Sequence, residues 1–256
     1  MNHAKKGIAL RLTAAGVAIH NALGDARVGE LLADFGYDVT KLQEGEVILG
    51  KAEGAVEAQV AARGAWQTAT VELAAAEGEA QRAFQALSQV IRAAFGMGHP
   101  VLASLGLNRP MPMRQSLFLT MATTLFDNVL ADANLVATVA RFGYTAKKLQ
   151  DEKGAILFMA KTLHARESAK GAAQQATMDQ DIAMGELDGW MSAFRRVAKV
   201  ALRGQRQLLE MLGILVRNAK TPAQRQAPAK AARTRKSRRD LLKVVTQKED
   251  SEQAVA

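Results

Sequence analysis

The residues most able to do chemistry in this sequence are its four histidines, and their spacing forms no metal or catalytic motif. They are His3, His20, His99 and His164. A helical di-iron site needs paired Glu-x-x-His motifs, whereas His164-x-x-Glu167 is reversed and has no second copy. The sequence also lacks the zinc-protease motif His-Glu-x-x-His, a nucleotide-binding glycine loop and a serine nucleophile elbow. We therefore expect no catalytic residues, no metal and no cofactor, and a protein that is not an enzyme.

Cysteine is absent from the 256 residues. Its absence excludes disulfides, iron–sulfur clusters, thiolate zinc sites and cysteine nucleophiles. No apolar run approaches the ~20 residues that a membrane-spanning helix needs, so no transmembrane segment is expected. Residues 1–26 loosely imitate a secretory signal, but Arg11 and His20 interrupt the apolar stretch, and we expect the segment to be retained. A cysteine-free chain fits a reducing compartment, so we expect a cytoplasmic location.

A second chemical feature is a concentration of positive charge near the C-terminus. The net charge of the whole chain is +9. Residues 217–243 alone carry +9, whereas residues 1–216 carry +2 and residues 244–256 carry −2. A segment with this charge favours contact with a polyanion such as nucleic acid. The candidate polyanion-binding residues are Arg217, Lys220, Arg225, Lys230, Arg233, Arg235, Lys236, Arg238, Arg239 and Lys243.

The same segment is poor in apolar side chains. Residues 218–238 contain Pro222 and Pro228 among Ala, Gln, Lys and Arg, and no large apolar residue. Such a stretch cannot bury enough surface to offset the entropy lost on ordering. We therefore predict that residues 217–256 form a disordered, flexible basic tail.

The sequence repeats internally, so each helix that would position a site is expected to occur twice. When position 21 is aligned with position 128, 11 of 24 positions in 21–44 are identical to those in 128–151. We call this shift, an offset of 107 in residue number, the repeat offset. Self-similarity at a fixed period indicates an internal duplication. We predict a helical repeat in residues 1–107, a Pro-containing linker in 108–116, a second helical repeat in 117–216, and the tail in 217–256.

Composition and periodicity predict helices throughout both repeats. Aromatic residues make up only 5% of a chain rich in Ala, which disfavours sheets. A first helix is predicted over residues 8–34, and a near-heptad apolar seam from Leu42 to Leu73 predicts a second. Because Gly is costly inside a helix, we expect a turn or kink near Gly78 and Gly185, followed by a third helix. The predicted fold class is therefore all-α, with two tandem homologous repeats forming antiparallel helical bundles.

Two Phe-Gly-Tyr turns contain the only tyrosines of the chain. Glycine suits the left-handed position that follows a helix, and the next residue can pack back onto the last helical turn. We interpret these turns as structural corners between antiparallel helices, with a duplicated ligand contact as the alternative. The turn residues are Phe35, Gly36, Tyr37, Phe142, Gly143 and Tyr144.

A second repeated element has the pattern Gly-Ala-x-Gln-x-Ala-Thr, at residues 64–70 and 171–177. Gln67 and Thr70 are three residues apart and so lie on one helical face. We expect this element to pack between helices, with hydrogen bonds to the other repeat or to a ligand as alternatives.

Helical repeats without a catalytic motif favour a non-enzymatic scaffold or assembly protein. We expect it to form homo-oligomers and to contact a polyanion through its tail. The alternative is a sequence-independent DNA- or RNA-binding protein of the nucleoid-associated kind. A helical bundle that holds a small ligand is less favoured, and so is a lipid-binding tail, because the tail lacks interleaved Phe, Trp or Leu.

Overall fold

The computed structural model describes residues 3–214, which form helices and, within that range, no strand. The prediction of an all-α fold is confirmed. The tail and its ten candidate polyanion-binding residues lie outside the described residues. The helices are α1 (His3–Gly24), α2 (Ala26–Ala33), α3 (Val39–Phe95), α4 (Pro100–Ser104), α5 (Gln115–Ala131), α6 (Ala133–Ala140), α7 (Ala146–Ala201) and α8 (Arg206–Met211).

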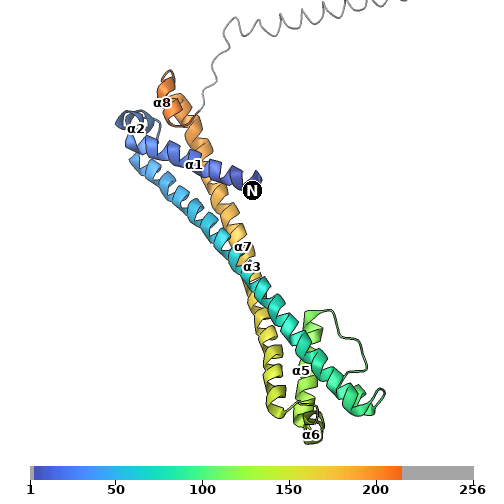
Figure 1. The fold of residues 1–256 in the computed structure, drawn as a ribbon. Coiled ribbons are helices and arrows are strands. Elements are labelled where there is room, and N and C mark those ends of the chain that lie inside the picture. The colour runs from blue at the N-terminus through green and yellow to red at the C-terminus, as the bar shows by residue number, and fades with distance from the viewer. Residues whose placement is uncertain (1–2, 215–256) are drawn as a thin grey trace, which may run out of the picture.

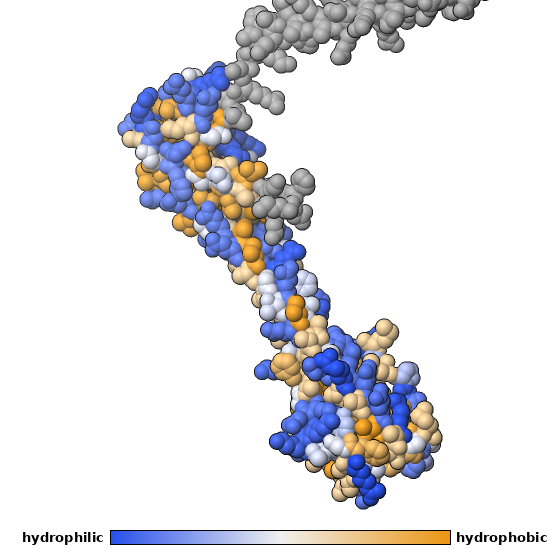
Figure 2. Space-filling model, viewed as in Figure 1, coloured by the Kyte–Doolittle hydropathy of each residue, from blue (hydrophilic) through white to orange (hydrophobic). Residues whose placement is uncertain are grey.

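Two long antiparallel helices form the axis of the molecule (Figure 1). α3 has 57 residues and α7 has 56. At 1.5 Å per residue each helix is about 85 Å long. The short helices gather at the two ends, with α1, α2 and α8 at one and α5 and α6 at the other. The result is a rod with two thick ends and a narrow waist, which is also visible in Figure 2.

Each end of the rod contains its own apolar core. Lobe 1 joins α1, α2 and α8 to the start of α3 and the end of α7, around buried residues such as Ile19 and Phe194. Lobe 2 joins α4, α5 and α6 to the end of α3 and the start of α7, around Phe118 and Phe126. Both cores therefore draw helices from both halves of the sequence, because the long helices run the full length of the rod.

The residues of the near-heptad seam form the face of α3 that packs against α7. Buried positions stop at Ala52 and resume at Leu73 in α3, and they stop at Thr162 and resume at Gln180 in α7. We call residues 53–72 and 163–179 the central segments. They contain no buried side chain, because no third helix covers the rod there (Figure 1). The α3 seam positions are Leu42, Gly45, Leu49, Ala52, Val56, Gln59, Ala62, Trp66, Ala69 and Leu73, all of them buried or half-buried.

The prediction of a turn near Gly78 and Gly185 is wrong, because the helix does not end at either residue. α3 continues through Gly78 and α7 through Gly185, so the predicted second and third helices are one helix in each half. The stripe of apolar residues continues beyond Gly78 with Ala80 and Phe84, which are buried in lobe 2. Burial of this stripe outweighs the ~1 kcal/mol that one Gly costs in a helix.

The predicted first helix is also wrong in one respect, because it is divided in two. α1 ends at Gly24, and Asp25 begins α2 with an extended backbone and a carboxylate that accepts from the Val28 N–H at 3.1 Å. Asp132 begins α6 in the same way. An Asp side chain satisfies the free N–H groups at a helix N-terminus, so each Asp favours the start of a new helix.

The helix bounds recur along the chain at the repeat offset. The first residues of α2 and α6 are separated by this offset, and so are those of α3 and α7. Glycines with positive φ recur at the same offset, with 81° at Gly36 and 84° at Gly143, and with 74° at Gly106 and 67° at Gly213. The same order of helices therefore occurs twice along the chain. The two long helices, α3 and α7, run antiparallel to each other.

Candidate functional site

The two Phe-Gly-Tyr turns lie at opposite ends of the rod, where α3 and α7 begin (Figure 1). At each turn the Tyr backbone N–H donates to a carbonyl five residues earlier, at 3.0 and 3.2 Å, which closes the preceding helix. Tyr37 and Tyr144 are buried, whereas Phe35 is 50% exposed and Phe142 is 51% exposed. Each tyrosine thus anchors its turn, and each phenylalanine faces solvent at an end of the molecule.

Lobe 1 contains an aromatic cluster behind its turn. Trp190 stacks on Phe194 with ring centroids 5.3 Å apart, and Tyr37 meets these rings edge-on at 5.7 and 5.4 Å. The indole lies against the backbone of Gly45, where an added Cβ would be 2.4 Å from Trp190. The α3 and α7 backbones approach closely here because residue 45 has no side chain.

Lobe 2 has different residues at the corresponding positions. Glu152 lies at the repeat offset from Gly45, and Ala83 lies at the same offset from Trp190. A pocket of about 430 Å³ lies here, lined by Ala83 and Glu152 among others. Glu152 Oε2 is buried without a hydrogen-bond partner. Lobe 2 thus has the polar side chain of Glu152 where lobe 1 has the contact between Gly45 and Trp190.

Burial in lobe 2 raises the pKa of two groups that contact each other, Tyr144 and Glu152. Burial and, to a smaller extent, the nearby Glu152 carboxyl, to which Tyr144 is hydrogen-bonded, together raise the pKa of Tyr144 to about 12. Burial also raises the pKa of Glu152, while Lys148, at 4.0 Å from Glu152 Oε1, and the Tyr144 hydroxyl act to lower it. A phenol with a raised pKa stays protonated at neutral pH, so Tyr144 serves as a hydrogen-bond donor and not as a base.

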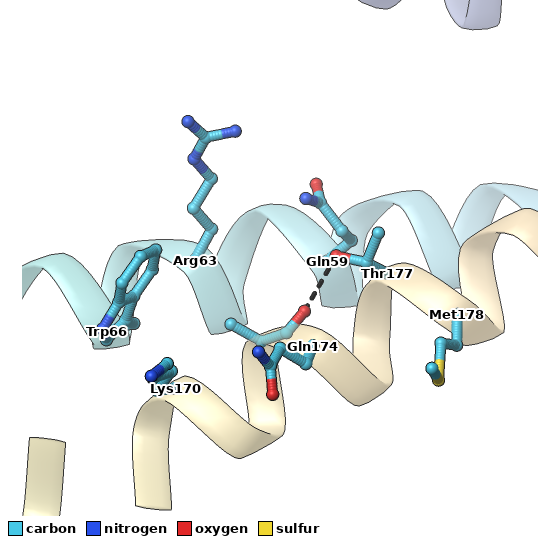
Figure 3. A pocket seen from close by; sticks show the side chains of 8 residues that line it. Gln59, Arg63, Trp66, Lys170, Gln174, Thr177 and Met178 are labelled. Atoms are coloured by element: carbon cyan, nitrogen blue, oxygen red, sulfur yellow. Dashed lines mark hydrogen bonds between the residues drawn. The ribbon is translucent and has the colours of Figure 1, made fainter. Parts of the chain in front are cut away.

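A larger pocket lies between α3 and α7 at the middle of the rod (Figure 3). We call it the central pocket, and its volume is about 700 Å³. It lies close to the midpoints of both long helices, and four of its eight lining residues belong to the repeated Gly-Ala-x-Gln-x-Ala-Thr elements. Its lining residues are Gln59, Arg63, Trp66, Lys170, Ala173, Gln174, Thr177 and Met178.

The repeated element does not pack between helices in the way expected. Gln67 and Thr70 are exposed, and the Thr70 hydroxyl donates to the Trp66 carbonyl of its own helix at 2.8 Å. Thr177 donates in the same way to the Ala173 carbonyl at 2.8 Å, the dashed line in Figure 3. On α3 the seam passes through Trp66 and Ala69, so the side chains of Gln67 and Thr70 lie outside it. Gln174 of the second element lines the central pocket.

Among the polar side chains that line the central pocket, hydrogen-bond donors outnumber acceptors. Its charged residues are Arg63 and Lys170, and no carboxylate lines it. The indole N–H of Trp66 is buried and has no acceptor within the described part of the chain. In Figure 3 the Trp66 ring stands between the two helices, with Lys170 on α7 near it and Arg63 extending outward from α3. Sequence reasoning identified the element but not the pocket, because the register of α7 against α3 brings these residues together.

The histidines are far from forming a site. His20 Nε2 lies 3.7 Å from Glu46 Oε1, and His99 caps α4 by accepting from the Val101 N–H at 3.3 Å. Across residues 3–214, no three His, Asp or Glu side chains cluster as metal ligands would. In the same range no helix combines the length and the apolarity needed to cross a membrane.

Comparisons of the chain with protein-family models, with curated proteins and with solved structures found no match.

Proposed function

We propose that the protein is a non-enzymatic scaffold, formed by two homologous repeats, whose copies associate end to end through the Phe-Gly-Tyr turns. The observation that carries this proposal is a half-exposed phenylalanine on the same kind of turn at both ends of a rod about 85 Å long. The recurrence of helix bounds at the repeat offset supports homology of the repeats. The lack of cysteine suits a reducing, cytoplasmic location, which is part of the proposal.

The presence of one similar surface at each end favours an open assembly. A surface that pairs with a second copy at one end leaves the other end free to pair again, so the rods join into linear chains. Burying the exposed halves of the two Phe side chains that meet at one contact removes on the order of 200 Å² of apolar surface, or about 5 kcal/mol before the entropic cost of association. The association should therefore be weak, reversible and dependent on concentration.

Light scattering coupled to size exclusion tests this proposal over a concentration series. The parent protein should show a mass that grows with concentration. Phe35→Ser or Phe142→Ser alone should stop growth at dimers, because one competent end remains. The double variant should be monomeric. Phe158→Ser is the matched control, since Phe158 is 56% exposed on α7 away from the turns and should not matter. A double variant that associates like the parent would refute the proposal.

The charge of the tail favours a second function, sequence-independent binding of nucleic acid. Residues 217–243 carry +9. Engagement of ~5 phosphates predicts a slope near −4.5 for the logarithm of affinity against the logarithm of salt concentration. Fluorescence anisotropy with a duplex of about 30 base pairs, from ~50 to ~300 mM salt, should show this slope for the full chain and no binding after deletion of residues 217–256. Equal affinity of the two proteins would exclude the tail as the binding element.

A further inference from the structure

We infer that the central pocket binds a small amphipathic anion, a carboxylate, sulfonate or phosphate joined to a flat apolar body. This function is separate from the end-to-end assembly, because the pocket lies at the waist of the rod and the Phe-Gly-Tyr turns lie at its ends.

The charge of the ligand follows from the lining. Arg63 and Lys170 line the pocket from different helices, and no carboxylate lines it. Arg63 has no ion pair among residues 3–214. Lys170 has a long one, at 3.9 Å from Glu167, whose other oxygen pairs with Arg166. Two cations in the lining, with little competition from carboxylates, favour an anion in the pocket.

Trp66, one of the lining residues, has a buried hydrogen-bond donor that lacks an acceptor within residues 3–214. The Trp66 Nε1–H is buried and, among the described residues, unpaired. A buried donor without an acceptor costs free energy, and native proteins satisfy nearly all such groups. An oxygen of a bound anion supplies the missing acceptor once the indole turns its N–H toward the pocket. The amides of Gln59 and Gln174 provide further donors in the same lining.

The apolar body of the ligand follows from the remaining lining. Trp66, Ala173 and Met178 provide an aromatic ring, a small side chain and a flexible thioether. The repeat offset relates Ala173 to Trp66, so a second large ring is absent where the other repeat could have supplied it. The volume of about 700 Å³ lies within the range typical of small-molecule sites. A flat apolar group stacked on Trp66 fits this space.

Two dyes with nearly the same apolar body separate charge from hydrophobicity. The anionic dye is 8-anilinonaphthalene-1-sulfonate, and the neutral one is N-phenyl-1-naphthylamine. Both are titrated by fluorescence into the full chain at physiological salt. The pair Arg63→Gln/Lys170→Gln should weaken binding of the sulfonate about tenfold, as expected for two partly exposed ion pairs, and should change binding of the neutral dye less than about twofold.

Two further variants complete the test. Lys161→Gln is the matched charge control, because Lys161 is exposed on α7 outside the pocket, and it should leave both affinities unchanged. Trp66→Phe keeps a ring but removes the N–H, so it should weaken sulfonate binding about fivefold and spare the neutral dye. Thermal melts establish that each variant is folded. The inference is overturned if the parent does not bind the sulfonate, or if the double variant binds it as the parent does. It is also overturned if both dyes lose affinity equally.

Discussion

Gly45 is the residue on which the close contact of α3 and α7 in lobe 1 depends. A Cβ there would lie 2.4 Å from the Trp190 ring, which is held by stacking on Phe194 and by the edge of Tyr37. Gly45→Ala should therefore destabilise the protein by roughly 1–3 kcal/mol, as overpacking does in a filled core. Urea unfolding monitored by circular dichroism measures this loss.

Gly50 provides the matched control for this substitution. It lies on the same helix, is exposed, and would place a Cβ with nothing within 4 Å. Gly50→Ala should therefore stabilise the protein by up to ~1 kcal/mol through helix propensity. If both variants were stabilised equally, the tight contact with Trp190 would not exist.

Glu152 should make stability depend on pH in a defined direction. Its pKa is raised in the folded state, chiefly by burial, so folding favours the protonated carboxyl. The stability that this group contributes is present below its unfolded pKa of about 4.3 and is lost as the pH rises through the folded pKa. Glu152→Gln cannot ionise, so relative to the parent it should gain stability between pH ~4 and pH ~7.

Urea unfolding of the parent and of Glu152→Gln at both pH values measures this difference. Comparison of the two proteins at each pH removes the contribution of every other titrating group. A variant that lost stability relative to the parent as the pH rose would show that the Glu152 pKa is lowered and that the lobe 2 contact is a favourable ion pair with Lys148.

Single residues differ in how far the sequence predicts their roles. The positive φ of Gly36 and Gly143 was predictable, because a Gly that follows a helix and precedes an aromatic residue commonly adopts the left-handed conformation that ends the helix. The exposure of Phe35 and the contact of Gly45 with Trp190 were not predictable. Both depend on where elements distant in the sequence meet, and local periodicity does not contain that register.

At the scale of elements, the central segments should be the least protected part of the two long helices. Residues 53–72 and 163–179 contain no buried side chain, whereas both flanks lie in apolar cores. Local opening of the middle therefore exposes little apolar surface and costs less free energy than opening of either lobe. Amide hydrogen exchange read by mass spectrometry should show faster exchange in these segments than in residues 73–91 or 184–198.

A uniform exchange rate along α3 and α7 would contradict this account. It would mean that each long helix opens as one unit, and that the waist is supported by contacts comparable to those in the lobes. The exposed Thr70 and Thr177 offer no such support, since both hydroxyls bond within their own helices.

The long helices also show why the order of elements was only partly predictable. The α3 seam follows directly from the spacing of its apolar residues. Gly78 and Gly185 suggested breaks, because propensity alone penalises a helical Gly by ~1 kcal/mol. Burial of residues such as Ala80 and Leu187 in the lobe cores stabilises the continuous helices and outweighs this penalty. That burial can be assessed only when the tertiary contacts are known.

At the scale of the whole molecule, the two Phe-Gly-Tyr turns lie at opposite ends of the rod. Both ends present a phenylalanine that is about half exposed, while the waist holds a pocket lined by cations and donors. Assembly through the ends leaves the waist of every copy accessible. A chain of rods would therefore repeat the central pocket at regular intervals along its length.

Small-angle X-ray scattering coupled to size exclusion tests end-to-end association most directly, because it reports length and cross-section together. As the concentration and the mass rise, the maximum dimension should grow by roughly the length of one rod, about 85 Å, for each added copy. The cross-sectional radius of gyration should stay constant. A doubled mass with an unchanged length and a larger cross-section would show side-by-side pairing and would contradict the account, as would a monomer at every concentration.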